Sequence, residues 1–257
     1  MKTFIEFLTE MAQTAQDGST IAKRGFKFEQ DLINAYMSEK RPKGFVNICN
    51  DMDDLVKKTF NKKNIIAIEK SQIVKTSERG LPKADISFVY TFDDGSSKVF
   101  SFSLKTTAAK RVSVHQSTPQ QFIDAVLSSI PSDSAEYAIL KQGIEEFGVA
   151  GSWKTIKQWD PKRVEMFKNS LNMITPNIAD YVMSKGNGGT QADAVVIFNP
   201  IKREYTVATD AEYLKICSET LRSMKGLGGV FSYTYPHGKR GKQIQLKMPV
   251  VLKKKMD

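Results

Sequence analysis

Two stretches of alternating apolar and polar residues lie close together in the chain and predict a β-hairpin. The runs 85–92 and 98–105 flank the connection Asp93-Asp94-Gly95-Ser96. Alternation over about eight residues is typical of half-buried strands, and a short Asp-Gly-Ser connection is typical of a hairpin turn. We therefore expect two paired strands. The apolar face of the second would carry Phe100, Phe102 and Leu104, and its other face Ser101, Ser103 and Lys105.

Helical spacing of apolar residues is the second pattern. A helix over 21–37 would bury one face, made of Phe28, Leu32, Ala35 and Tyr36. Gly44 and the polar region 47–50 should end this helical pattern. Further helical patterns cover 119–129, 134–147, 161–183 and 210–224. Pro161 behind Asp160 is typical of a helix start, and Pro176 should kink or split that segment.

Two more strand pairs follow toward the end of the chain. Residues 194–199 and 204–208 form one pair after a glycine-rich loop at 186–190, and residues 230–235 and 243–248 form the other. Helices mixed with antiparallel pairs predict an α/β fold with a mixed central sheet flanked by helices. We expect residues 1–18 to be a leader or a flexible N-terminal segment, and 19–257 to be a single domain.

The distribution of positive charge along the chain indicates an anionic partner. The 257 residues carry 38 Lys plus Arg against 28 Asp plus Glu, a formal net charge of +10. Eight cations lie within 225–255, which holds no acidic residue, and 96–123 is a second acid-free stretch. Basic segments interleaved with aromatic residues and glycine are typical of proteins that bind a polyanion. For residues 253–255 the alternative is a solvated basic tail.

Other features of the composition exclude several classes of protein. No run of 18 apolar residues exists, so the sequence predicts no membrane span. Cys49 and Cys217 are the only cysteines and lie far apart, which argues against a disulfide framework or a thiolate zinc site. His115 and His237 are the only histidines, which argues against a histidine-rich metal cluster.

The hairpin also carries candidate chemistry. Asp85 opens the first strand and Lys105 closes the second, so antiparallel pairing would bring the two side chains together on the polar face. A carboxylate that binds a hard divalent cation, beside a lysine that orients water, suits phosphodiester hydrolysis. A plain structural ion pair is the alternative interpretation.

The residues around this pair resemble a known nuclease motif. PKADISFVY followed by FSLK is similar to the PD-(D/E)xK motif, with Pro82, Asp85, Ser103 and Lys105 in the motif positions. More narrowly, GLPKADISFVYTF and SFSLKTTAAKRVSVHQ resemble the catalytic hairpin of the MspI-type restriction endonucleases. Two other stretches are similar to segments of that family, in the same order along the chain: GFKFEQDL near its start and GLGGVFSYTYPHGKRGKQIQLK near its end.

The resemblance implies a restriction-endonuclease-like fold and a Mg²⁺-dependent endonuclease. The catalytic residues would be Asp85, Lys105, Ser103 and Glu29, and the metal ligands Asp85, Glu29 and the carbonyl of Leu104. Ser103 departs from the family, which usually has Glu, Asp, Gln or Asn there. A serine hydroxyl would hold the metal only through water.

The resemblance also implies double-stranded DNA as the partner of a monomer or homodimer. Residues 84–106 would be the catalytic hairpin and 186–257 the basic DNA-reading part. The residues expected to contact DNA are Lys110, Arg111, His115, Gln116, Lys225, Lys239, Arg240 and Lys242.

A second resemblance concerns the first ten residues. MKTFIEFLTE is similar to the capsid-targeting leaders of T-even-type phage internal head proteins, and Leu8-Thr9-Glu10 matches their cleavage consensus. It implies a phage nuclease that is cut after Glu10, packaged in the virion and delivered into the host cytoplasm. Two alternatives stay open: a DNA-binding protein whose nuclease site has decayed at Ser103, and a head protein that condenses DNA by charge.

Overall fold

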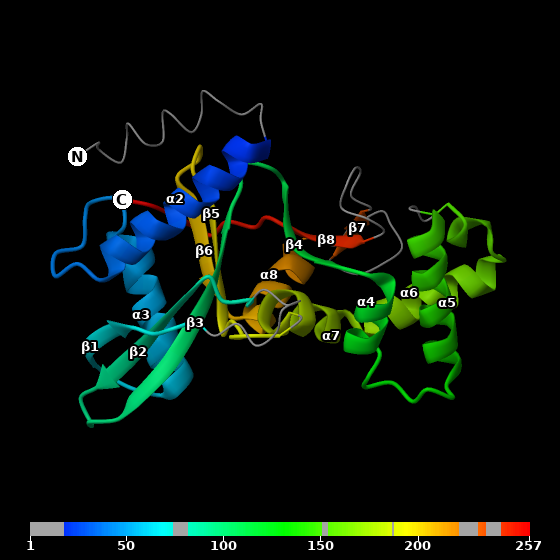
Figure 1. Cartoon of the computed structure of the whole chain (residues 1–257), viewed down its shortest axis with the longest axis horizontal. Coiled ribbons are helices and arrows are strands. Elements are labelled where there is room, and N and C mark those ends of the chain that lie inside the picture. Colours follow the sequence, from blue (N-terminus) through cyan, green and yellow to red (C-terminus); the bar gives the residue numbers. More distant parts are fainter. Residues whose placement is uncertain (1–17, 74–81, 151–153, 187, 221–230, 235–242) are drawn as a thin grey trace. The chain divides into compact units, whose positions relative to one another are not determined.

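The computed structural model describes residues 18–73, 82–150, 154–186, 188–220, 231–234 and 243–257, and Figure 1 shows the elements that they form. Contacts divide the chain into two compact units. The first comprises Met1–Lys110, Asn187–Asp210 and Val250–Asp257, and the second comprises Arg111–Gly186 and Ala211–Pro249. This division is finer than the single domain expected over 19–257.

The first unit is built on a six-stranded sheet with the strand order β1-β2-β3-β5-β6-β9. Its strands are β1 (Ile65–Lys70), β2 (Ile86–Phe92), β3 (Ser97–Thr106), β5 (Ala194–Asn199), β6 (Glu204–Ala208) and β9 (Lys254–Lys255). Only the β3–β5 pair is parallel, and the other four pairs are antiparallel. The mixed sheet predicted from the sequence is therefore confirmed.

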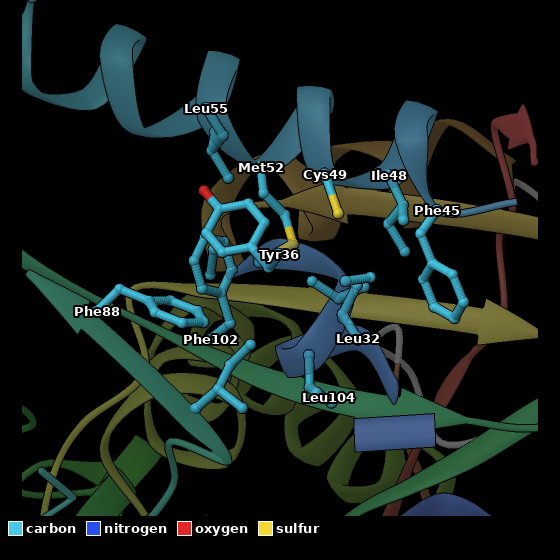
Figure 2. Close-up of a cluster of buried hydrophobic side chains, with 14 of the residues drawn as sticks. Leu32, Tyr36, Phe45, Ile48, Cys49, Met52, Leu55, Phe88, Phe102 and Leu104 are labelled. Carbon is cyan, nitrogen blue, oxygen red and sulfur yellow. The ribbon is translucent and has the colours of Figure 1, made fainter. Parts of the chain in front are cut away.

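Two helices, α2 (Gly18–Tyr36) and α3 (Val46–Phe60), pack on one face of this sheet. The predicted helix face is confirmed, because the Phe28 ring of α2 stacks 4.3 Å from the Phe198 ring of β5. Figure 2 shows side chains of α3 pointing toward Phe102 and Leu104 of the sheet. Burying this apolar face supplies most of the driving force that holds helices on a sheet.

The predicted interruption at residues 47–50 is wrong, because these residues lie inside α3. Asn47 and Asn50 are exposed, whereas Ile48 and Cys49 between them are buried at helical spacing. The two asparagines therefore occupy the solvent face of an amphipathic helix. Tertiary packing outweighs their modest helix propensity.

The β2–β3 hairpin has the predicted pairing and faces. Ile86 lies opposite Phe102, and Phe88 lies opposite Phe100. Phe100, Phe102 and Leu104 belong to the hydrophobic core beneath the helices. The other face is more buried than a solvent face would be, since Ser87, Ser101 and Ser103 are each at most 2 % exposed.

Residues 253–255 do not form a solvated tail. Lys254 and Lys255 form strand β9 against β6, and Met256 is buried in the core of the first unit. The Lys254 ammonium lies 2.5 Å from a carboxylate oxygen of Asp51. The backbone of this part of the basic segment therefore belongs to the sheet, while its lysine side chains are exposed.

The second unit combines a small sheet with helices. Its three strands, β4 (Arg111–Ser117), β8 (Ile244–Pro249) and β7 (Ser232–Thr234), are antiparallel in the order β4-β8-β7. The helical elements are α4 (Pro119–Val126), α5 (Ala135–Ala150), η1 (Ile156–Gln158), α6 (Pro161–Met173), α7 (Thr175–Ala179), the π-helical turn η2 (Asp180–Lys185) and α8 (Asp210–Thr220).

Two sequence signals set helix boundaries in this unit as predicted. Asp160 caps α6 by accepting a hydrogen bond from the Arg163 backbone amide at 3.0 Å, with Pro161 at the first helical position. Pro176 splits the predicted helix 161–183, because α6 ends at Met173 and α7 begins at Thr175. Strand β4 was not predicted from the sequence.

Several predictions fall outside the described residues. These are the leader, the end of the helix toward residue 224 and the turn of the C-terminal hairpin, with Lys225, Lys239, Arg240 and Lys242. Over the residues that the structure describes, none of the helices is long and apolar enough to cross a membrane. Cys49 and Cys217 are both buried, and no disulfide forms among the described residues.

Candidate active site

The carboxylate of Asp85 is the centre of the candidate active site. Asp85 directly precedes β2, and its backbone amide donates to the carbonyl of Phe102 at 2.9 Å. Its Oδ2 accepts three hydrogen bonds, from Ser103 Oγ at 3.1 Å, Leu104 N at 2.6 Å and Lys105 Nζ at 3.1 Å. The hairpin residues predicted for the site therefore meet at one oxygen atom.

The end of β3 holds the ammonium group of Lys105 in place. Lys105 Nζ also donates to the carbonyl oxygen of Leu104 at 3.0 Å. The side chains of Lys105 and Asp85 are 19 % and 26 % exposed, so the pair is sheltered yet within reach of solvent. Charge-assisted hydrogen bonds in such a setting fix the orientation of both groups.

A second carboxylate, Glu29, comes from α2. Burial and, to a lesser extent, the negative charge of Asp85 raise the pKa of Glu29 to about 7, and the charge of Lys105 partly opposes them. Glu29 therefore lies in the same electrostatic environment as the Asp85–Lys105 pair. The adjacent residue, Phe28, is stacked on the sheet and anchors this turn of the helix.

Lys83 is a basic residue near the site that the sequence did not single out. It is 8 % exposed, and burial together with the charge of Lys105 lowers its pKa to about 7, with Asp85 opposing. The backbone amides of Lys83 and Ala84 both donate to the carbonyl of Thr190, at 3.0 and 3.1 Å. Lys83 lies in the PKAD segment, but only its burial distinguishes it from an ordinary surface lysine.

The donor groups of this site fit a hard divalent cation. They are all oxygens: the carboxylates of Asp85 and Glu29 and the carbonyl of Leu104. Burial and, second, the charge of Asp85 raise the pKa of Glu29, and a bound cation would oppose both effects by stabilising the ionised carboxylate. No cluster of three His, Cys, Asp or Glu side chains forms among the described residues. Mg²⁺ needs only one or two protein carboxylates, because it keeps several water molecules.

Ser103 serves the site through Asp85. It is 1 % exposed, and its hydroxyl group donates to the Asp85 carboxylate. Position 103 therefore has a hydroxyl group where the motif that this hairpin resembles usually has a carboxylate or an amide. Here the serine fixes the orientation of Asp85.

A separate group of candidate residues lies on the three-stranded sheet of the second unit. Ser113 of β4 and Ser232 of β7 both lie opposite Lys247 of β8, and Gln116 lies opposite Gln245. Gln245 and Lys247 are partly exposed and alternate with Ile244, Leu246 and Met248, which are buried. We call the side defined by Ser113, Gln116, Ser232, Gln245 and Lys247 the polar face.

The structure places the described DNA-contact candidates in different settings. Lys110 is exposed at the end of the first unit, and the Arg111 guanidinium lies 3.5 Å from the carbonyl of Lys247. Gln116 belongs to the polar face. His115 pairs with Leu246 and its Nε2 lies 2.9 Å from the hydroxyl of Tyr181, on the apolar side of the sheet. That placement does not support a direct contact of His115 with DNA.

Sequence reasoning missed Gln245 as a candidate and counted Lys247 only as part of a basic segment. The sequence does indicate that Gln245 and Lys247 share a face, because residues 243–248 alternate between polar and apolar side chains. The polar positions of such a strand share one face.

Three known proteins or families are similar to this chain. The profile of a family described as restriction endonuclease MspI matches residues 6–248. The type II restriction enzyme BsuFI of Bacillus subtilis is 26 % identical over 172 residues, which cover 66 % of this chain and 41 % of that enzyme. The chain thus spans about two fifths of the length of this curated relative.

The fold is also similar to a solved structure. The crystal structure of restriction endonuclease MspI in complex with its cognate DNA has a TM-score of 0.68 and 20 % sequence identity to this chain. The match covers 95 % of this chain and 96 % of that one. At this level of identity the likeness shows a shared fold.

Proposed function

The chain belongs to the restriction endonuclease MspI family, and on that premise we propose that it is a type II restriction-like deoxyribonuclease that hydrolyses phosphodiester bonds of double-stranded DNA. One observation carries the proposal. Ser103, Leu104 and Lys105 all donate to the carboxylate of Asp85 at the end of one hairpin. This arrangement matches the positions of the PD-(D/E)xK motif and the chemistry of phosphodiester hydrolysis.

In this proposal Lys105 supplies positive charge at the reacting phosphate. Its ammonium group, held by Asp85 and by the carbonyl of Leu104, orients a water molecule and stabilises the negative charge that develops in the transition state. Ser103 and the backbone amide of Leu104 keep the Asp85 carboxylate in one orientation. A pre-organised site of this kind needs no rearrangement at the moment of reaction.

We propose Mg²⁺ as the cofactor, held by Asp85, Glu29 and the carbonyl of Leu104. Bound by these residues, Mg²⁺ would supply Lewis-acid chemistry toward the phosphate oxygens and would lower the pKa of water. A carboxyl group binds a cation only after it has lost its proton. Because the pKa of Glu29 is raised, we expect cation binding to depend on pH.

The polar face is proposed to read the sequence of the duplex. Glutamine amides make paired hydrogen bonds with adenine, lysine donates to guanine or to phosphate, and serine accepts or donates to several bases. Gln116 and Gln245 are neighbours across two strands, and Ser113 and Lys247 form the next pair on the same face. Short specific sites would be read by such a small set of side chains.

The proposed origin is a phage. The resemblance of residues 1–10 to a capsid-targeting leader supports a protein cut after Glu10, packaged in the virion and delivered into the host cytoplasm. Mass spectrometry of the protein from purified virions tests this. A mature chain that starts at Met11 supports the proposal, and an intact leader or absence from virions contradicts it.

The central experiment is cleavage of plasmid DNA by the purified protein in Mg²⁺ and in EDTA. We expect double-strand cuts in Mg²⁺ only, and Lys105→Ala should abolish them. Lys98→Ala is the matched control, since Lys98 lies on the same strand and is exposed at its far end. Sequencing the fragment ends identifies the recognition site.

Failure of the wild type to nick or cut would overturn the proposed activity. Binding that persists in EDTA and ignores Asp85→Ala would then favour the alternative of a DNA-binding protein with a decayed site.

A further inference from the structure

Strand β4 contains one residue more than its partner strand can match. Ser113 lies opposite Lys247 and His115 lies opposite Leu246, so the pairing register skips Val114. Such a β-bulge re-aims the side chains that follow it. In a regular strand His115 would share a face with Ser113, whereas here Gln116 does.

Residues that lie opposite one another on the three strands form rows across the sheet, and the bulge decides which residue of β4 belongs to each row. Ser113, Lys247 and Ser232 form one row, and the next row consists of His115, Leu246 and Tyr233. Gln116 and Gln245 begin a third row. The first and third rows belong to the polar face, and the middle row points to the opposite side.

A chain of aromatic rings supports the middle row from the apolar side. His115 Nε2 lies 2.9 Å from the hydroxyl of Tyr181, and their rings meet edge to face with centroids 4.6 Å apart. Phe122 of α4 lies 6.2 Å from the Tyr181 ring and 6.1 Å from the Tyr233 ring. The rings thus link β4 to β7 beneath the sheet.

The Tyr181 hydroxyl is a well-defined partner. Tyr181 is 4 % exposed in the π-helical turn η2, and burial raises its pKa to about 12. Its proton is therefore retained at neutral pH. Breaking a buried hydrogen bond of this kind costs free energy.

The competing arrangement is a slip of one residue. Without the bulge Val114 would lie opposite Leu246, His115 would move to the polar face, and Gln116 would move to the apolar side. The His115–Tyr181 hydrogen bond forms only in the bulged register. It therefore selects the register in which Gln116 stands beside Gln245.

We propose that His115 and Tyr181 are positioning residues for sequence recognition: their hydrogen bond fixes the register of β4 that places Ser113 and Gln116 on the polar face. The inference rests on the proposed function, because it assigns the polar face to DNA reading. His115 and Tyr181 would touch no base themselves.

The test measures sequence selection by binding and by cutting. A library of duplexes with random sequence is enriched on the full-length protein in EDTA, and cleavage sites are mapped separately in Mg²⁺. Tyr181→Phe and His115→Leu remove the hydrogen bond, whereas His115→Gln can keep an amide group near the position of Nε2. We expect the preference for the selected sequence to fall about tenfold in the first two variants and to be largely retained in His115→Gln.

Tyr205→Phe is the matched control for lost stability. Tyr205 lies in the first unit and donates to Asp51 at 2.7 Å, so the variant loses a comparable hydrogen bond far from β4 in the sequence. It should unfold at a lower temperature with unchanged sequence preference. Unchanged preference in Tyr181→Phe and His115→Leu would overturn the inference.

The two readouts separate this inference from the proposed activity. A wild type that enriches a sequence but does not cut contradicts the activity alone, and the variants still test the positioning role by binding. A wild type that enriches no sequence at all overturns the positioning role, because no selection exists for these residues to support.

Discussion

The two sheets of this protein place their functional side chains by different rules. In the six-stranded sheet, β2 and β3 alternate regularly, and this alternation alone brings Ser103 and Lys105 to Asp85. In the three-stranded sheet, a single extra residue at Val114 changes which side chains share a face. The alternation of the sequence predicts which side chains share a face of a regular hairpin. It does not predict this for a strand that contains a bulge.

The proposed functions divide along the same line. The first sheet would supply the rate of hydrolysis and the second the choice of sequence. The following changes test that division, and they are arranged from the largest expected effect to the smallest.

Asp85→Asn should have the largest effect. The change keeps the shape of the side chain but removes the charge that holds Lys105 and a cation. We expect the cleavage rate to fall on the order of 10³-fold while the sequence enriched by binding stays the same. A cleavage rate within tenfold of the wild type, measured under single-turnover conditions, would contradict the assignment.

Gln245→Ala should show the opposite behaviour. We expect the preference for the selected sequence to fall about tenfold, since one amide is lost from the polar face, while cutting of other sequences continues. Mapping of cleavage sites measures this ratio. Gln120→Ala, an exposed glutamine on α4 of the same unit, is the control and should change nothing. Equal behaviour of the two variants would remove Gln245 from the recognition face.

Ser103→Ala isolates one hydrogen bond of the active site. The change removes one of three donors to Asp85, so we expect a five- to tenfold slower cleavage rate, equivalent to about 1 kcal/mol. Ser101→Ala is the matched control, because the buried Ser101 hydroxyl bonds to Ser87 at 2.8 Å. Both variants should lose similar stability. A slower rate in both would show that the effect comes from the strand and has no specific link to Asp85.

Glu29→Gln tests the charge balance of the same site. The pKa of Glu29 is raised from 4.5 to about 7, so the folded state binds this proton more tightly than the unfolded state. The contribution of protonated Glu29 to the free energy of unfolding is therefore present below pH 4.5 and lost as the pH rises through 7. The variant should therefore be more stable than the wild type at pH 8 in EDTA, by about 1–2 kcal/mol after allowance for solvent screening. Urea unfolding at pH 4.5 and pH 8 measures the difference. A gain that is equal at both pH values would contradict the assignment.

Lys254→Ala should have the smallest effect. Its ammonium group pairs with Asp51 on the surface, so we expect about 0.5 kcal/mol or less in unfolding and no change in DNA affinity. Lys247→Ala, in contrast, should weaken DNA binding and reduce its salt slope by about one. An equal loss of DNA affinity in both variants would contradict the assignment of DNA binding to the three-stranded sheet.

The sequence predicted the parts of the site that depend on neighbouring residues. Asp85 and Lys105 were found because they end two adjacent strands, and the core face of α2 was found from its spacing. Glu29 came from the resemblance to a family, since nothing in the spacing connects a helix residue to a hairpin far along the chain. Lys83 was missed, because its altered pKa comes from burial and from Lys105, which only the folded chain brings together.

Two differences between the expected and the observed arrangement have a common physical origin. Residues 47–50 look like a helix break, yet the buried Ile48 and Cys49 hold them in α3. His115 was expected to contact DNA together with Gln116, yet the bulge places it on the side of Tyr181. In both cases a tertiary contact decides between two local arrangements that the sequence pattern leaves close in energy.

The parallel pairing of β3 with β5 has a consequence for biosynthesis. Phe102 and Ala194 are partners, and most of the second unit lies between them in the chain. The hairpin with Asp85 and Lys105 can form early from local contacts, whereas β5 and β9 join the sheet only after a long loop has closed. Contacts of such long range fold slowly. A newly made chain would therefore contain the hairpin with Asp85 and Lys105 well before it completes the sheet that holds this hairpin.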